Sequence, residues 1–265
     1  MPTVALVGVP WDEHSSFLRG AADAPPRIRA AMRSPSSNLS TESGLELGTD
    51  ERFRDEGDLD IPQGTNALAA IEQGVAAIVA SGARVLALGG DHAISYPVVR
   101  AQAARHPGLT LVHFDAHPDL YDEFEGDRLS HACPFARIME EKLVRRLVQV
   151  GIRTLNAPQR AQVERFGAEL VEMKDFWPDL VVEAGGPVYV SVDLDALDPA
   201  FAPGVSHPEP GGLSTRDVIG VVQRLRGQVV GADVVELNPA RDVGGATANV
   251  AAKIVKELLA RLLSD

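Results

Sequence analysis

Continuous apolar runs, rich in Val and Leu, constrain the fold more than any other feature of this sequence. A strand with one face in water alternates apolar and polar residues, whereas a strand covered on both faces is apolar throughout, as in a parallel sheet. The runs lie at residues 3–9, 83–90, 109–115, 145–152, 188–195 and 228–237. They therefore predict strands of a mainly parallel sheet with helices on both faces.

Segments with helical periodicity lie between these runs. Residues 66–80 and 247–263 carry apolar side chains at helical spacing. Residues 215–226 follow Ser214, and Asp217 stands three residues after it, which is the pattern of a capping box. Alternating strands and helices are typical of an α/β fold with a mainly parallel sheet. We therefore expect three layers, with the sheet in the middle.

The whole chain, residues 1–265, is expected to form a single domain. This length is within the range that single α/β domains reach. Residues 33–63 are rich in Ser and then acidic. We interpret them as a long surface excursion within the domain, because nothing after them resembles a separate core.

Charge and cysteine content limit the partners and the compartment. The formal net charge of -12 argues against nucleic acid and anionic membranes as partners and suits a small cationic substrate. No apolar stretch approaches the length of a membrane span. The single cysteine, Cys133, excludes an internal disulfide, and the first residues read as a strand and not as a signal peptide. We therefore expect a cytoplasmic protein.

Acidic and imidazole side chains follow three of the predicted strands. In open α/β sheets, ligands bind beyond the carboxyl ends of the strands. The candidates are His92 after the second run, Asp115, His117 and Asp119 after the third, and Asp193 and Asp195 after the fifth. Burying such groups costs free energy unless something pairs with them, and a bound cation would do so. Oxygen ligands with two imidazoles and no thiolate favour Mn²⁺, or Fe²⁺ or Co²⁺, over a structural zinc site.

The number of candidates predicts two metal ions. Six ligands are too many for one catalytic ion with an open position, but they suit a pair of ions with bridging carboxylates. Four carboxylates balance two divalent ions, and a hydroxide held between the ions leaves one negative charge. A substrate with one positive charge would neutralise it.

Other polar residues near these strands receive structural interpretations. We expect Asp198, which precedes Pro199, to form a turn, and Asp91 to orient His92. His113 lies within a strand, and we expect a core histidine whose polar atoms are satisfied.

Several blocks of the sequence resemble signature blocks of the ureohydrolase family, which comprises arginases, agmatinases and relatives. They read GGDHAISYP, HFDAHPDLYD and VSVDLDALDPAFAPGVSHPEPGGLS, with further similarity in SSFLRG, SHACPFARIME, QVGIRT and GADVVELNPARD. The similarity covers essentially the whole chain and is greatest to the plant-type arginases. The resemblance implies one α/β domain, two Mn²⁺ ions per chain, and a homotrimer or homohexamer.

The resemblance also implies roles for individual residues. The family's metal ligands fall on the six candidates above, and Asp119 counts among the catalytic residues as well. The catalytic histidine, which shuttles protons, falls on His131. The carboxylate that grips the guanidinium falls on Glu236. Water activated by the two ions would attack the guanidino carbon, releasing urea and an amine.

The choice between arginine and agmatine depends on the loop at residues 119–130, DLYDEFEGDRLS. Its carboxylates would favour the dicationic agmatine, whereas Arg128 could receive the carboxylate of arginine. Ser130 and His207 are further candidates for contact with the substrate. We expect L-arginine to be cleaved to ornithine and urea. The alternative is agmatine, and another guanidino acid or formimidoylglutamate ranks lower.

Two other classes fit the sequence less well. Histone-deacetylase-like enzymes have a similar fold but need one metal, so the presence of His92 and Asp119 argues against them. A non-catalytic descendant would be expected to lack at least one ligand, and none is missing.

Overall fold

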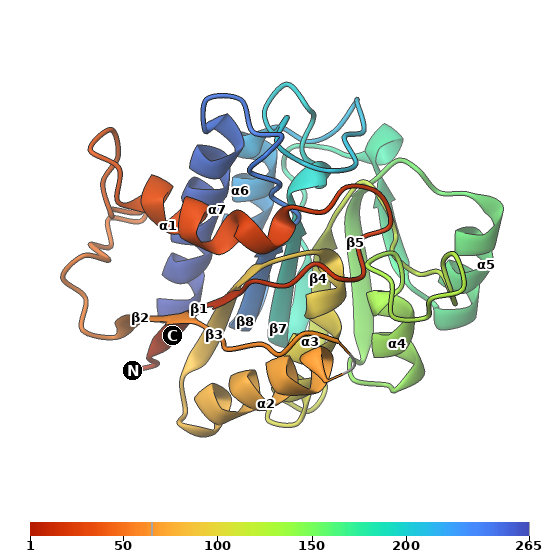
Figure 1. The fold of residues 1–265 in the computed structure, drawn as a ribbon, viewed down its shortest axis with the longest axis horizontal. Coiled ribbons are helices and arrows are strands. Elements are labelled where there is room, and N and C mark those ends of the chain that lie inside the picture. Colours follow the sequence, from red (N-terminus) through yellow and green to blue (C-terminus); the bar gives the residue numbers. More distant parts are fainter. Residues whose placement is uncertain (65, 265) are drawn as a thin grey trace.

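The computed structural model describes residues 1–64 and 66–264 (Figure 1). These residues form an eight-stranded sheet in the order β2-β1-β3-β8-β7-β4-β5-β6, and every pair of neighbouring strands is parallel. The strands are β1 (Val4–Val9), β2 (Phe53–Asp58), β3 (Arg84–Gly89), β4 (Thr110–Phe114), β5 (Arg146–Ile152), β6 (Glu169–Glu172), β7 (Glu183–Asp193) and β8 (Arg226–Val235). The α-helices of the described residues are α1 (Ala24–Met32), α2 (Ala67–Ala80), α3 (Ser95–Ala103), α4 (Pro134–Glu140), α5 (Ala157–Phe166), α6 (Thr215–Arg224) and α7 (Ala246–Leu263).

Helices cover both faces of the sheet, as Figure 1 shows. On one face, α1, α6 and α7 pack in a core with the apolar side chains Ile28, Val218 and Leu258. On the other face, α2, α3 and α4 form a second core, which includes Ile71 and Phe135. The expected three-layer α/β fold with a parallel sheet is confirmed. None of the described helices combines the length and the apolar character needed to cross a bilayer.

The elements with strong periodicity were predicted well. All the predicted strands are present, although β7 begins at Glu183, before the expected start, because Gly185, Gly186 and Pro187 obscure the apolar pattern there. The predicted helices correspond to α2, α6 and α7. The capping box at the start of α6 is present, with the Ser214 side chain accepting from Asp217 N.

The interpretation of residues 33–63 as a surface excursion is wrong in part, because β2 lies within it. This strand pairs with β1 at one edge of the sheet. Its sequence, FRDEGD, is charged and mostly exposed, which is typical of an edge strand that resists pairing with another molecule. This segment has no apolar run, which is the signal of a strand covered on both faces, and so the sequence did not predict β2. The other edge strand, β6, was missed for the same reason.

The strand order brings the candidate ligands together. Strands β3, β8, β7 and β4 are consecutive neighbours in the middle of the sheet. Because they are parallel, their carboxyl ends lie along the same edge. His92 follows β3, Asp115 follows β4, Asp193 ends β7 and Glu236 follows β8. Residues far apart in the sequence therefore meet at this edge.

Candidate metal centre and active-site pocket

Four buried ligand atoms converge at the ends of β3, β4 and β7. His92 Nδ1 lies 3.2 Å from Asp115 Oδ2, 3.1 Å from Asp119 Oδ2 and 3.1 Å from Asp193 Oδ2. This nitrogen forms no properly aligned hydrogen bond with any of them. One imidazole nitrogen carries at most one proton and cannot satisfy three carboxylates. The arrangement fits a cation surrounded by four ligands.

A second group of ligand atoms lies beside the first. His117 Nδ1 is 3.0 Å from Asp195 Oδ2 and 3.4 Å from Asp115 Oδ1. Asp115 thus presents one oxygen to each group, and both groups have the spacing of possible metal ligands. Such a shared carboxylate is the arrangement expected of a bridge between two ions.

The protonation behaviour of the carboxylates indicates that this centre requires positive charge. Burial and repulsion from Asp115 raise the pKa of Asp195 to about 7 and that of Asp119 to about 6. Burial and repulsion from Asp195 also raise the pKa of Asp193 well above its ordinary value. Groups with such shifts are ionised only at a cost when no cation is present. The donor set therefore fits two divalent cations.

A buried hydrogen-bond chain supports the far side of the His92 ring. His92 Nε2 lies 3.0 Å from Ser191 Oγ, and that hydroxyl donates to Asp233 Oδ1 at 2.6 Å. Tyr189 and Ser95 donate to the other oxygen of Asp233 at 2.7 and 2.8 Å. Because the Ser191 proton is used on Asp233, the His92 Nε2–H must donate to Ser191. The chain thus fixes the proton on Nε2 and leaves Nδ1 free as a ligand.

The interpretation of Asp91 as the residue that orients His92 is wrong. Its side chain accepts hydrogen bonds from Ala93 N, His14 N and Ser15 Oγ, and so it holds a turn and the N-terminal loop. Ser191 and Asp233 have the orienting position instead. They lie within strands β7 and β8, where the sequence pattern showed only covered strands.

His113 is a satisfied core histidine, as expected. Its Nε2 lies 2.8 Å from Asp115 Oδ2, and its Nδ1 lies 2.8 Å from Gln149 Nε2. Burial lowers its pKa to about 4, so the ring is neutral. The Gln149 amide donates to Nδ1, which leaves the His113 proton on Nε2 and directed at Asp115. Asp198 also behaves as expected, since its carboxylate accepts from the backbone of Ala200 and Gly211 in a turn.

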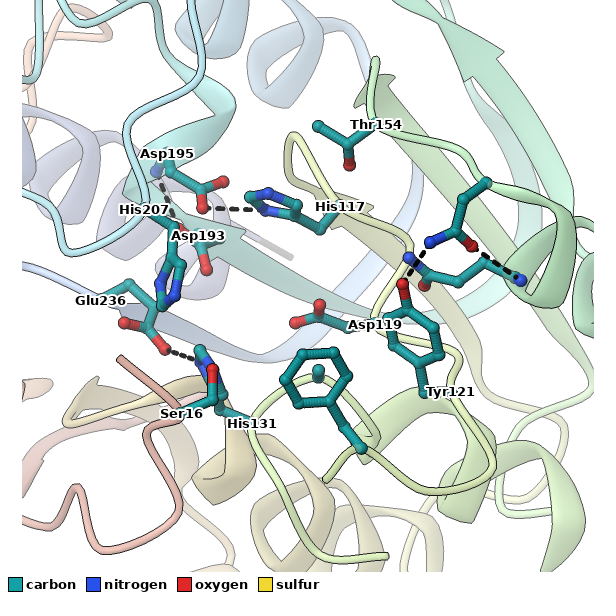
Figure 2. A pocket seen from close by; sticks show the side chains of 14 residues that line it. Ser16, His117, Asp119, Tyr121, His131, Thr154, Asp193, Asp195, His207 and Glu236 are labelled. Atoms are coloured by element: carbon teal, nitrogen blue, oxygen red, sulfur yellow. Dashed lines mark hydrogen bonds and ion pairs between the residues drawn. The ribbon is translucent and has the colours of Figure 1, made fainter. Parts of the chain in front are cut away.

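A pocket of about 290 Å³ opens above the ligand groups (Figure 2). Its lining includes His117, Asp119, Asp193 and Asp195 from these groups. The remaining lining residues are Ser16, Tyr121, Phe124, His131, Ala132, Thr154, Asn156, Gln159, His207 and Glu236. The ligand groups therefore face a cavity close to the size range of small-molecule sites.

Glu236 and His131 form a hydrogen-bonded pair on one side of this pocket. Glu236 Oε1 accepts from His92 N at 2.9 Å and lies 2.9 Å from His131 Nδ1. His131 Nε2 is 2.8 Å from Ser16 Oγ. Burial opposes the charged imidazole, but the Glu236 carboxylate outweighs it and raises the pKa of His131 to about 9. Glu236 adopts a positive φ of 67°, a left-handed conformation that is uncommon outside glycine and is often found at functional sites.

The structure does not place all of the predicted substrate contacts in the pocket. His207 lines it, with its ring centroid 5.0 Å from that of His131. Arg128, however, is paired with Asp122 at 2.7 Å and with Glu140 at 3.0 Å, and it does not line the pocket. Ser130 is 2% exposed and its hydroxyl accepts from Ala132 N. Asp122, Asp127 and Arg128 of the loop at 119–130 thus pair with partners outside the pocket lining.

Several pocket residues were not predicted from the sequence. Ser16 belongs to SSFLRG, which was noted only as part of a wider resemblance. Tyr121 lies in the HFDAHPDLYD block but attracted no prediction. Thr154, Asn156 and Gln159 follow β5, and a neutral polar side chain after a strand carries no recognisable signal. The position of β5 two places from β7 in the sheet explains their location.

Comparison with known proteins identifies the family of this chain. The Arginase family model matches residues 2–260. The chain belongs to the arginase family. It is 49% identical to "Arginase 1, mitochondrial" from Arabidopsis thaliana, over 98% of this chain and 81% of the relative. Among solved structures, the arginase from Medicago truncatula matches with a TM-score of 0.92 at 47% identity, covering 98% of this chain and 87% of that one. The predicted resemblance to ureohydrolases and plant-type arginases is confirmed.

The expectation of a cytoplasmic protein is contradicted by these relatives. The Arabidopsis relative above is named as mitochondrial, and a second Arabidopsis relative, 47% identical over 98% of this chain and 80% of its own length, is "Arginase 2, chloroplastic/mitochondrial". A single cysteine excludes an internal disulfide, and this fits a reducing compartment. It does not separate one reducing compartment from another, and so it could not carry the prediction.

Proposed function

We propose that this protein is an arginase, which hydrolyses the guanidino group of L-arginine to give ornithine and urea. The observation that carries this proposal is the pocket in which two ligand groups sharing Asp115 lie next to the Glu236 carboxylate. Nearly full-length similarity to plant arginases supports the same reaction.

The metal centre is proposed to hold two Mn²⁺ ions per chain. His92, Asp119 and Asp193 would bind one ion, His117 and Asp195 would bind the other, and Asp115 would contact both. When bound, two such ions lower the pKa of water between them and so supply a nucleophile near neutral pH. The oxygen-rich donor set without thiolate supports manganese over zinc. Metal analysis of the purified protein tests this, with two Mn per chain expected.

Glu236 is proposed to hold the guanidinium. Its Oε1 is occupied by His92 N and His131, whereas its Oε2 accepts no hydrogen bond from the described residues. Glu236 is 4% exposed and lines the pocket. Its Oε2 is therefore well placed to accept charge-assisted hydrogen bonds from a guanidinium. Binding there would orient the guanidino carbon toward the ligand groups, where the carboxylates of Asp119 and Asp193 also lie.

His131 is proposed to carry the proton that the departing amine requires. Its raised pKa means that the imidazole is protonated near neutral pH, and its ring lines the pocket beside Glu236. A protonated imidazole can donate to the leaving nitrogen and later recover a proton. Ser16, hydrogen-bonded to Nε2, would hold the ring in place during this transfer.

The test of the proposed function is release of urea from L-arginine and agmatine, side by side, by protein loaded with Mn²⁺ and freed of excess metal. Release mainly from L-arginine supports the proposal. Release mainly from agmatine would make the protein an agmatinase, which is the second candidate because the loop at 119–130 carries several carboxylates.

The proposal extends to the organisation of the protein. We propose that residues 1–265 act as one ureohydrolase domain, supported by the single sheet that runs through the described residues. We also propose a homotrimer or homohexamer, on the strength of the family resemblance. Light scattering after size-exclusion chromatography would measure the mass against the 28.2 kDa of one chain.

A further inference from the structure

Three side chains on one side of the pocket form a continuous hydrogen-bond chain. Glu236 Oε1 lies 2.9 Å from His131 Nδ1, and His131 Nε2 lies 2.8 Å from Ser16 Oγ. All three residues line the pocket, and Figure 2 shows them together on the side away from Tyr121. Both ring nitrogens of His131 therefore have a partner, and a proton on this ring meets either Glu236 or Ser16.

The chemistry of the two partners decides which ring nitrogen can give up a proton. The Glu236 carboxylate also accepts from His92 N at 2.9 Å, and an ionised carboxylate has no proton to donate. His131 Nδ1 therefore carries a proton in both states of the ring. Nε2 is the nitrogen that gains and loses one. With its proton it donates to Ser16 Oγ, and without it it accepts from the Ser16 hydroxyl.

The Ser16 hydroxyl can pass on a proton because it is both a donor and an acceptor. When His131 Nε2–H donates to Oγ, the hydroxyl proton must turn to another acceptor. Among the described residues, none accepts this proton, and Ser16 lines the pocket. The group that the proton reaches is then a ligand that lies in the pocket next to Glu236.

The backbone before Ser16 is held against the segment that carries His131. His131 N donates to His14 O at 3.2 Å. Asp91 Oδ2 accepts from His14 N at 3.1 Å and from Ser15 Oγ at 3.2 Å. These contacts fix the distance between Ser16 and the ring. A hydroxyl in a fixed position is already aligned for proton transfer when the substrate arrives.

We propose that Ser16 is a catalytic residue that relays a proton from His131 to the leaving nitrogen of the substrate. This inference rests on the proposed function, which places the guanidinium at Glu236 and assigns to His131 the proton for the departing amine. In the relay, the Nε2–H bond breaks as a new O–H bond forms at Ser16. The original O–H bond of Ser16 breaks as an N–H bond forms on the leaving nitrogen. The electron pair of the carbon–nitrogen bond then moves to that nitrogen, and the amine departs.

The relay ends in a hydrogen-bond pattern that the same contact accommodates. His131 becomes neutral, and the new hydroxyl proton of Ser16 points at Nε2 across the 2.8 Å contact. Ser16 has then gained one proton and lost one, so it is unchanged. His131 recovers its proton from water before the next turnover.

The charge of His131 decides between a relay and a nucleophile. A carboxylate, an imidazole and a serine in this order also form the chain that activates a nucleophilic serine, which requires a neutral ring to take the serine proton. Burial opposes the charged ring, but Glu236 outweighs it and raises the pKa of His131 to about 9. The other titratable groups that face the ring are Asp91, Asp119 and His207. Near neutral pH the ring therefore holds its proton, and Ser16 receives a proton instead of losing one to His131.

Ser16→Ala tests the relay with two substrates whose leaving nitrogens differ in basicity. In L-canavanine an oxygen replaces the methylene group next to the guanidino nitrogen of L-arginine, so the departing group is an alkoxyamine. An alkoxyamine is a far weaker base than an alkylamine, and it departs with less help from a proton donor. We expect the variant to lower kcat by about 100-fold or more for L-arginine and by less than about 10-fold for L-canavanine.

Two further measurements separate the relay from indirect effects. In a crystal structure of the Mn²⁺-loaded variant, His131 Nδ1 should remain hydrogen-bonded to Glu236 Oε1, since this contact does not involve Ser16. Ser15→Ala is the matched control, because its hydroxyl donates to Asp91 and it does not line the pocket. This control should keep kcat close to that of the wild type. Thermal unfolding and metal content of each variant verify that the fold and the metal centre persist.

The outcomes separate this inference from the proposed function. A wild-type kcat in Ser16→Ala, an equal loss on both substrates, or a loss of the same size in Ser15→Ala would overturn the relay. A displaced His131 ring in the Ser16→Ala structure would also overturn it and leave Ser16 as a residue that only holds the ring. Each of these results leaves urea release by the wild type intact and so refutes the relay alone. A wild type that releases no urea from any guanidino compound refutes the proposed function and the relay together.

Discussion

Ser191→Ala should weaken binding of the ion at His92 without touching any metal ligand. The Ser191 hydroxyl is the acceptor for His92 Nε2–H and is itself held by Asp233, and all three residues are buried. The substitution leaves the buried His92 N–H without a partner, which costs about 1–3 kcal/mol. It also frees the ring to take the tautomer with its proton on Nδ1, which cannot bind a metal.

These contributions predict a loss of about 10- to 100-fold in affinity for one of the two ions. Competition with a chelator of known Mn²⁺ affinity, followed by metal analysis, would show two classes of site in the variant where the wild type retains both ions. Ser95→Ala is the matched control. Ser95 is equally buried and donates to the same Asp233 carboxylate, but it does not contact the His92 ring. If both variants retain Mn²⁺ equally well, the hydrogen-bond chain does not orient His92 and the reasoning is refuted.

Further substitutions test other parts of the account. His117→Ala should lose about one of two Mn per chain, together with urea release, and activity that survives with a single ion bound would contradict the two-ion centre. Glu236→Gln should lower kcat/KM for L-arginine by at least about 10-fold with metal content unchanged, because the guanidinium loses a charged acceptor; an unchanged kcat/KM would remove Glu236 from the site. Arg128→Gln should leave the preference between L-arginine and agmatine unchanged, since its guanidinium is paired with Asp122 and Glu140 outside the pocket; a selective loss of L-arginine hydrolysis would restore it as a carboxylate contact. Glu42→Gln should lower the melting temperature at pH 7, because hydrogen bonds from Arg216 and Gln223 hold the pKa of Glu42 well below its ordinary value. A carboxyl group whose pKa is lower in the folded than in the unfolded state stabilises the fold fully above the unfolded pKa, and this stabilisation is lost as the pH falls toward the folded pKa. The difference in melting temperature from wild type should therefore shrink as the pH falls below the unfolded pKa. A difference that persists in strong acid would point to packing instead.

The parts of the structure that depend on a short stretch of sequence could be predicted, and the parts that depend on contacts between distant residues could not. Val- and Leu-rich runs identify strands that are covered on both faces, so β1, β3, β4, β5, β7 and β8 could be predicted. The ligands could also be predicted, because a parallel sheet brings the ends of its strands to one edge whatever the loops do. The edge strand β2 could not, since its charged sequence has no core to face. Ser191 and Asp233 were missed because a single polar residue inside an apolar run resembles a tolerated exception, and its partner is known only once the strand order is known.

The charge of the loop at 119–130 says little about the charge of the substrate, and the pairing of its side chains gives the physical reason. Counted along the sequence, the carboxylates of this loop favour a dicationic ligand. In the folded chain, Asp122 pairs with Arg128 and Arg137, and Asp127 pairs with His14. Charges that already have partners exert little attraction across a solvated pocket mouth. Changing the charge of Asp122, Asp127 or Arg128 should therefore alter the preference between L-arginine and agmatine little, and a large change in that preference would refute this reasoning.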